Sequence, residues 1–436
     1  MQKRFFVAFA LAAVASASTW FYANRILKAQ QLADAAAHAR PRGNLSDLYP
    51  RWLGARELLK RNHNPYSPEI TREIQLGYYG RPLDPARSAD PRSDEPKDQQ
   101  GFAYPAYVVF LLAPTVGLPF ETVQFAFRWI LIALAVITVL LWLRVLQWKA
   151  SCESAVIFAM LAVGWLPMVQ GIKLQQLSLL VAGLLAACAA CLSAGWLFLA
   201  GGLLALATIK PQLAWPLVLW LLVWAGSDWR TRRRFIFGFG IVMLLLLGGA
   251  ELVLPGWLWM FLNAIRQYHQ YTQNESVLVW LFGGVAGHIA EAASVLVCGL
   301  YLSRVRMEPA TTAAFGRSLS VVLALTALIV PMFAPYNQVL LIPAILSLLH
   351  SARSGEPILP AIRLARTIGG IFVIWPWIAT LGLSAAYLWL TPELRQKIYL
   401  LPFYSNFMVP VFVFGLALLD AFMNSGRNLR DYTPAE

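Results

Sequence analysis

The sequence predicts an all-α polytopic membrane protein, and its composition and apolar runs support this class. Of 436 residues, 58% are hydrophobic and only 13% are charged, whereas soluble domains carry about 25% charged residues. The runs 129–143, 177–192 and 235–254 are almost free of charge, and about 20 apolar residues suffice to cross a bilayer. The composition therefore argues against an ordinary soluble enzyme.

The net charge of +13 indicates membrane topology rather than nucleic-acid binding. Much of the positive charge lies in short loops between apolar runs, as in the arginine-rich segment 230–234. Lys and Arg in short loops keep those loops on the cytoplasmic side. We therefore expect the lipid bilayer, and no nucleic acid, as a partner. The four cysteines and five histidines show no metal-ligand spacing, so we expect no cofactor, with a carboxylate-held divalent ion left open.

Residues 1–24 predict an uncleaved first transmembrane helix that enters from the cytoplasm. Lys3 and Arg4 precede the apolar run 5–22, and no convincing signal-peptide cleavage site follows it. Residues 25–119 then form a large exterior (periplasmic) loop. Its segment 25–102 carries 13 basic and 10 acidic residues among 78.

Within this loop, three segments have distinct patterns. Residues 46–61 predict an amphipathic helix, and 67–77 predict a second, with Ser67 as N-cap and a proline at its first position. Residues 81–100 are rich in Pro, Asp, Arg and Ser, which is typical of a loop. Residues 102–119 are apolar but contain three prolines, and we expect them to dip into the membrane without crossing it.

Residues 120–436 predict a multi-helix transmembrane region, giving about 12 spans in all and two cytoplasmic termini. With this topology, every basic short-loop cluster lies inside. The alternative makes 102–119 a span and 198–224 a single helix, which exposes Arg144 and Lys149 and buries Lys210 at mid-membrane. A central lysine costs about 2.5–3.5 kcal/mol, so we prefer the first topology.

The preferred topology gathers amide-, aromatic- and lysine-rich turns on the exterior side. These turns are 170–176, 210–212, 257–276, 335–338 and 391–399. The exterior face therefore has the character of a binding site, while the cytoplasmic turns are mainly basic.

A family resemblance follows from the order of short motifs along the chain. They are Asp47, Asn64-Pro65-Tyr66, Tyr104-Pro105, the Gln-rich turn 170–176, Ile209-Lys210-Pro211 and Asn274-Glu275-Ser276. Over roughly residues 40–345 the sequence resembles glycosyltransferase family 87, polyprenol-phosphate-mannose-dependent enzymes with the GT-C membrane fold. The resemblance implies inverting transfer of a hexose, expected to be mannose, from a polyprenyl-phosphate donor to a hydroxyl of a glycolipid or glycan acceptor at the exterior membrane face.

In the family the early aspartate is the catalytic base, and the matching residue here is Asp47. A base must take the proton of the acceptor hydroxyl during attack on the anomeric carbon. The alternative is that Asp47 only caps the helix that begins near it. Glu57, in the same loop, is interpreted as half of a surface ion pair with its basic neighbours.

The departing phosphate requires cationic groups, for which the sequence offers Lys210, Lys173, Arg266 and His269. Lys210 lies between apolar segments and needs an anion or a watery cavity; the alternative is a lysine that snorkels to the surface. Arg266 and His269 are one turn apart on a predicted helix and could both contact one phosphate. The alternative, equally well supported, is that this helix only lies at the membrane interface. Candidates for sugar or acceptor binding are Asn64, Tyr66, Tyr104, Gln175, Asn274, Ser276, Tyr336 and Asn337.

Two other functions fit a polytopic protein. A transporter or flippase of lipid-linked sugars would show internal repeats, and none is visible in the sequence. A polysaccharide polymerase or ligase would favour a large loop late in the chain, whereas the large loop here is early. Both alternatives therefore explain the sequence less well than a glycosyltransferase does.

Overall fold

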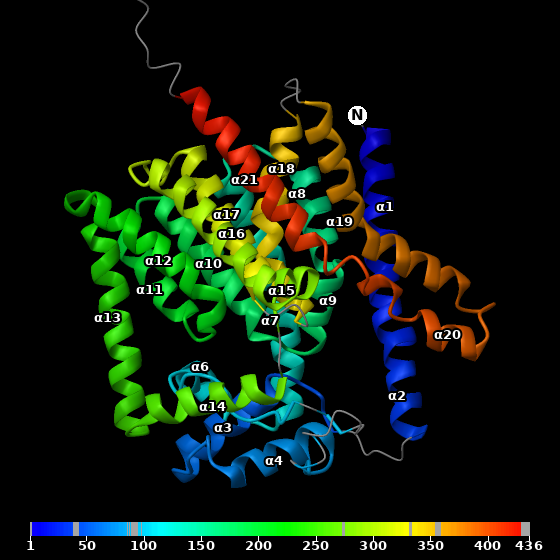
Figure 1. Cartoon of the computed structure of the whole chain (residues 1–436). Helices are drawn as coiled ribbons and strands as arrows, with labels where there is room; N and C mark the ends of the chain where they lie inside the picture. Colours follow the sequence, from blue (N-terminus) through cyan, green and yellow to red (C-terminus); the bar gives the residue numbers. More distant parts are fainter. Residues whose placement is uncertain are drawn as a thin grey trace, which may run out of the picture.

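Two groups of helices make up the computed structural model of the chain, a long bundle and a layer of shorter helices across one of its ends (Figure 1). The structure describes residues 2–37, 43–84, 86, 88, 95–96, 98–272, 275–330, 334–353 and 359–428. Every regular element in these ranges is helical, which confirms the predicted all-α class.

The N-terminal helix is longer than the predicted first span. α1 (Gln2–Phe21) continues through the π-helical turn η1 (Tyr22–Leu27) into α2 (Lys28–Ala37). Its segment Phe5–Ala33 is apolar and long enough to cross a membrane. The predicted boundary at residue 24 therefore falls inside one continuous helical rod, which packs against α8 (Cys152–Val163) and α19 (Pro360–Ala386).

The end layer consists of α3 (Tyr49–Arg61), α4 (Pro68–Tyr79), α6 (Val108–Leu112) and α14 (Trp257–Thr272), which lie at the lower end of the bundle in Figure 1. In α4 the hydroxyl of Ser67 accepts the backbone N–H of Ile70 at 3.3 Å, and Pro68 opens the helix, as predicted. α6 has five residues and continues into the short turn η2 (Ala113–Thr115). Five residues rise about 8 Å, so this helix cannot cross a bilayer, in agreement with the expectation for 102–119.

Several helices of the bundle have the length and composition of membrane spans, which confirms a polytopic membrane protein. Within the described ranges, four full-length apolar helices accompany the N-terminal one: α7 (Phe120–Val145), α13 (Trp229–Val253), α16 (Gly284–Val305) and α19. α8 and α9 (Leu166–Lys173) form a pair bent by 60°. Shorter apolar helices are α10 (Leu177–Ser193), α11 (Leu197–Ala207), α12 (Pro211–Ser227), α17 (Ala313–Ile329) and α21 (Val409–Asn428). The number of about 12 spans stays a prediction.

The remaining elements are short and connect these helices. They are α15 (Val277–Phe282), η3 (Pro335–Leu341), α18 (Ile342–Arg353), α20 (Pro392–Ile398) and η4 (Leu401–Phe403). A turn at residues 208–210 separates α11 from α12, so 198–224 is not a single helix. Pro211, which has no N–H to donate, takes the first position of α12. Lys210 consequently lies in a turn.

The opposite end of the bundle, which we call the basic end, carries the arginine clusters of the predicted cytoplasmic loops. Arg232 is buried there, and its guanidinium donates to the carbonyls of Trp224, Arg306, Met307 and Glu308. It also stacks on the ring of Trp224, with Cζ 4.2 Å from the ring centroid. Arg232 therefore joins the first turn of α13 to the end of α12 and to the segment that follows Val305.

Candidate active site

The candidate site lies where the end layer meets the bundle, and Asp47 is at its centre. The backbone N–H of Asp47 donates to the carbonyl of Leu174 at 2.9 Å, which joins the first exterior segment to the Gln-rich turn. The side chain of Asp47 makes no cap on α3, whose N-cap residue is Leu48. In this structure Asp47 therefore does not act as a helix cap.

Two side chains hold the carboxylate of Asp47 instead. The hydroxyl of Tyr78, from α4, donates to Oδ1 at 2.9 Å, and Nε2 of Gln176 donates to Oδ2. Burial raises the pKa of Asp47, and the charges of Arg51 and Lys210 and the two hydrogen bonds oppose that rise. Both donors belong to other elements, so the position of the carboxylate depends on the tertiary structure.

Lys210 is connected to the same network. Its ammonium donates to Ser178 Oγ at 2.6 Å and to Gln176 Oε1 at 3.2 Å, and it lies 5.1 Å from the ring centroid of Tyr336. Ser178 in turn donates to Asn337 Oδ1 at 2.8 Å. Burial, with a contribution from Arg51, lowers the pKa of Lys210 to about 7, against the favourable charge of Asp47.

Arg51 is a second cation of the site, half-buried, that the sequence analysis did not select. It stands one helical turn after Asp47, and its Nη1 donates to the backbone carbonyl of Asp47 at 2.8 Å. The guanidinium also stacks on Tyr104, 4.3 Å from the ring centroid. The i, i+4 spacing from Asp47 on a predicted helix was the available signal.

Asp98 is a further carboxylate that the sequence analysis missed, because it lies in the segment predicted to be a loop. Gln100 donates to it through its backbone N–H at 2.9 Å and its side-chain amide at 2.8 Å. Burial and the charge of Asp47 raise the pKa of Asp98 to about 6, while the Gln100 hydrogen bond and Arg51 oppose this. No sequence motif distinguishes Asp98, since its proximity to Asp47 arises from folding of the loop.

Four of the predicted phosphate- and sugar-binding residues lie at the cluster. They are Lys210, Tyr104, Tyr336 and Asn337. Gln175 lies beside it, where its Oε1 accepts from Ser46 at 2.7 Å and from Gln124 at 3.0 Å. This amide connects the start of the end layer to α7 and the Gln-rich turn.

The other predicted site residues are placed differently. Lys173 donates to the carbonyl of Ala23 in η1 at 2.6 Å, and Arg266 and His269 are exposed on α14. On the inner side of α14, Tyr268 is close enough to Asp98, Arg51, Tyr104 and Asp47 for their charges to act on its hydroxyl, whose pKa burial raises.

Asn64, Tyr66 and Ser276 have local structural contacts. Asn64 accepts from the backbone N–H of Tyr66 at 3.0 Å, and the Tyr66 hydroxyl donates to the Tyr104 carbonyl at 2.6 Å. Ser276 caps α15 by accepting from Val279 at 3.3 Å. Asn274 lies outside the described residues.

The interpretation of Glu57 as half of a surface ion pair requires correction. Its side chain is only 3% exposed, and it accepts from Arg61 at 3.2 Å and lies 3.1 Å from Nδ1 of His63. The pairing is as expected, but helix packing buries the carboxylate. Glu57 is therefore a structural anchor of α3.

Among the described residues, no group of three or more His, Cys, Asp or Glu side chains has a metal-binding arrangement. Asp47 and Asp98 are close enough for the charge of one carboxylate to raise the pKa of the other. Two carboxylates are few for a hard divalent cation, which takes six to eight oxygen ligands or several waters. The arrangement places the hydrogen-bonded carboxylate of Asp47 beside the two cations Lys210 and Arg51, which suits proton transfer next to an anionic leaving group.

The comparisons with known proteins agree with the motif order. A family model described as glycosyltransferase family 87 matches residues 102–335, just over half of the chain. No curated protein and no solved structure matches the chain. The match includes the Gln-rich turn, Lys210 and Tyr104, all at the cluster around Asp47. The chain therefore belongs to glycosyltransferase family 87, a family of membrane glycosyltransferases.

Proposed function

We propose that this membrane glycosyltransferase moves a hexose, mannose in the first instance, from a polyprenyl phosphate to a hydroxyl of a glycolipid or glycan acceptor. The reaction takes place at the end layer, on the exterior face of the membrane. The observation that carries the proposal is the half-buried carboxylate of Asp47, held by Tyr78 and Gln176 and placed beside Lys210 and Arg51.

Asp47 is the general base of the proposed reaction. The acceptor hydroxyl oxygen forms a bond to the anomeric carbon while its proton passes to the Asp47 carboxylate. The bond between the anomeric carbon and the phosphate oxygen breaks, and its electron pair leaves with the lipid phosphate. A single displacement of this kind inverts the anomeric configuration. A carboxylate with a raised pKa is a better proton acceptor than a solvent-exposed one.

Lys210 and Arg51 are the proposed phosphate-binding groups, in place of Lys173, Arg266 and His269. Lys210 is buried and Arg51 is half-buried. The charge of Asp47 acts on both, and Arg51 lowers the pKa of Lys210 by repulsion. Two cations held together in a buried site are stabilised by a bound dianion such as a lipid phosphate. The lipid tail of the donor stays in the bilayer beside the bundle.

Replacement of Asp47 by Asn tests the proposal. The purified protein is incubated with radiolabelled polyprenyl-phosphate mannose and a lipid extract, and the anomeric configuration of the product is determined. We expect Asp47→Asn to lower turnover by at least about 100-fold, because an amide cannot accept the proton. The protein should still fold, with a modest decrease of the thermal midpoint, since an amide keeps an acceptor for Tyr78 but loses the one for Gln176 Nε2.

The matched control is Asp84→Asn, which changes an exposed carboxylate of the same loop and should retain activity. Near-full activity of Asp47→Asn would show that the base is another group, with Asp98 the next to examine. A retained anomeric configuration would contradict single displacement, and the absence of any transfer with other lipid-phosphate hexoses would favour a transporter.

A further inference from the structure

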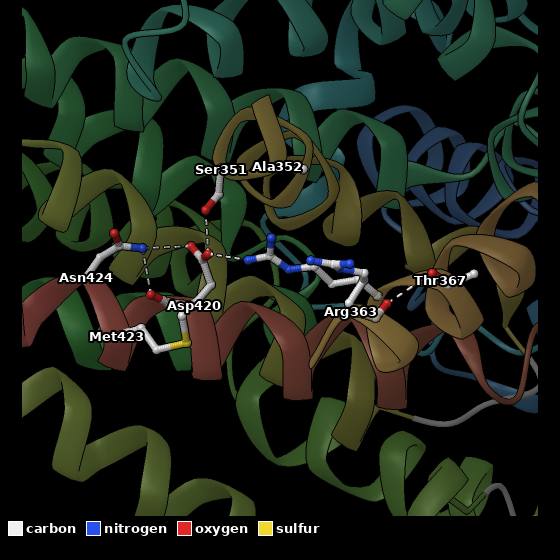
Figure 2. Close-up of a pocket in the computed structure, with 8 residues that line it drawn as sticks. Ser351, Ala352, Arg363, Thr367, Asp420, Met423 and Asn424 are labelled. Carbon is white, nitrogen blue, oxygen red and sulfur yellow. Dashed lines mark hydrogen bonds and ion pairs between the residues drawn. The ribbon is translucent and has the colours of Figure 1, made fainter. Parts of the chain in front are cut away.

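A cavity system lies at the basic end of the bundle, remote from Asp47. One part, the polar pocket, has a volume of about 290 Å³ and is lined mainly by Ser351, Arg363, Arg366, Thr367, Asp420 and Asn424 (Figure 2). The other part, the apolar groove, has a volume of about 470 Å³. Ala352 and Arg366 line both, so the two parts lie next to each other.

The apolar groove runs along helices of the bundle. Its lining comes from α7, α8, α18, α19 and α21, and Arg366 is its one charged residue. Leu349 and Ile374, on two of these helices, are 44% and 49% exposed, so the groove is open at the surface that faces lipid. Ligand-binding cavities have volumes of about 300–1,000 Å³, and this groove falls within that range.

A missing side chain helps to form the groove. Gly370 lines it in the middle of α19, and a Cβ atom added there meets no atom within 4 Å. The space beside this glycine is therefore not occupied by protein. Glycine in a helix interior costs about 1 kcal/mol relative to alanine, and here it leaves room for a ligand.

The polar pocket has an excess of positive charge. Asp420 accepts from Arg366 at 3.0 Å and from Ser351 at 2.6 Å, which neutralises one of the two arginines (Figure 2). Arg363, exposed on the preceding turn of α19, adds a second guanidinium. The buried Nε of Arg366 has no hydrogen-bond acceptor among the described residues. That atom is shielded from solvent, so the attraction for an anion comes from the one net positive charge of the pocket.

We propose that this cavity system binds one anionic phospholipid of the leaflet at the basic end. Its phosphate contacts Arg363 and Arg366, and one acyl chain lies in the apolar groove beside Gly370. Both halves of the cavity are needed, because the groove alone would accept any lipid chain and the polar pocket alone any small anion. Anionic lipids give the cytoplasmic leaflet a negative surface, which matches the predicted orientation of this end. The site lies at the opposite end from Asp47 and so differs from the donor site.

Lipid retention by the purified full-length protein tests the proposal. After exchange into detergent, the protein is titrated with phosphatidylglycerol or phosphatidylcholine and examined by native mass spectrometry. We expect one phosphatidylglycerol to remain bound to the wild type, at least tenfold more often than phosphatidylcholine. Gly370→Leu fills the groove, and Arg363→Gln removes the unpaired charge. Each should reduce retention of phosphatidylglycerol at least fivefold.

Matched controls use the same substitutions elsewhere. Gly382→Leu lies on the exposed side of α19 in open space, and Arg230→Gln lies at the basic end on α13; both should retain the lipid as the wild type does. Arg366 is left intact because its loss would leave Asp420 buried without its ion-pair partner. If Gly370→Leu does not fold, Arg363→Gln decides the outcome.

A thermal-shift titration adds an independent readout, because a ligand that binds the folded state raises the thermal midpoint in a concentration-dependent way. Phosphatidylglycerol should raise the midpoint of the wild type and of both controls, whereas glycerol 3-phosphate, which has no chain, should not. Equal retention of the two lipids, or unchanged retention by Arg363→Gln and Gly370→Leu, would overturn the proposal. A full shift with glycerol 3-phosphate would show a simple anion site instead.

Discussion

The side-chain amide of Gln176 donates a hydrogen bond to Oδ2 of Asp47, although the two residues are 129 positions apart. The oxygen of the same amide accepts from Lys210 at 3.2 Å. An amide has a donor side and an acceptor side, so the carboxylate and the ammonium together fix its orientation. Gln176 therefore couples the proposed base to the proposed phosphate-binding lysine, and its side chain cannot flip without losing both contacts.

Gln176→Glu should shift the pH dependence of transfer. A second carboxylate against Asp47 replaces a hydrogen-bond donor with a negative charge, and both changes raise the pKa of Asp47. We expect the acid limb of the kcat/KM profile to move by at least about one unit to higher pH. Gln267→Glu makes the same charge change on the exposed side of α14 and should leave the profile in place. An unchanged acid limb in Gln176→Glu would show that this limb does not report the titration of Asp47.

Lys210→Gln should weaken use of the lipid-phosphate donor. Loss of a charge-assisted contact is worth about 1.5–3 kcal/mol, so kcat/KM for the donor should fall roughly tenfold to 150-fold. Because the pKa of Lys210 is lowered to about 7, its protonated fraction in the free enzyme falls as the pH rises through that value. The wild-type kcat/KM should decline above about pH 7, and the decline should be absent in Lys210→Gln.

Lys397→Gln, which changes an exposed lysine of α20, is the control and should keep both the rate and the decline. If Lys210→Gln uses the donor within about twofold of the wild-type rate, Lys210 does not bind the phosphate and only extends toward the surface.

Asp98→Asn should change how stability depends on pH. The pKa of Asp98 is raised from 3.8 to about 6 in the folded protein, so between these values the folded state binds more protons than the unfolded state. The corresponding stability is present below pH 3.8 and is lost as the pH rises to about 6. Relative to Asp98→Asn, the wild type should lose on the order of 2–3 kcal/mol across this window.

The measurement is the thermal midpoint of the purified protein at about pH 4, 5 and 6, which lie within the window of the shift. Asp84→Asn is the control, since this carboxylate is exposed. Parallel curves for the wild type and Asp98→Asn would show that Asp98 titrates as it does in the unfolded chain.

Thiol labelling in intact cells should settle the orientation of the two ends. A cysteine introduced at Glu69, exposed on α4 in the end layer, should react with a membrane-impermeant maleimide from outside. The native Cys152 is exposed at the start of α8 near the basic end, and it should react only after permeabilisation. The introduced cysteine is examined in a Cys152→Ser background. Labelling of Cys152 from outside would reverse the proposed topology.

The order of motifs in the sequence was sufficient for the family, and apolar runs of span length were sufficient for the all-α membrane class. Local chemistry also fixed individual helix starts: Ser67 and Pro68 predicted α4, and Pro211 placed Lys210 in a turn. These features depend on residues close together in the chain, where backbone hydrogen bonding and capping decide the outcome.

Only the tertiary structure decided which side chains surround Asp47. Tyr78 and Asp98 have ordinary sequence contexts. They approach Asp47 and Gln176 because the end layer folds onto the Gln-rich turn. The same folding directs Lys173 to Ala23 and leaves Arg266 and His269 exposed. Sequence spacing specifies the face of a helix on which a residue lies, but contacts between distant segments, and the desolvation that shifts the pKa values of Asp47 and Lys210, arise only when the helices pack together.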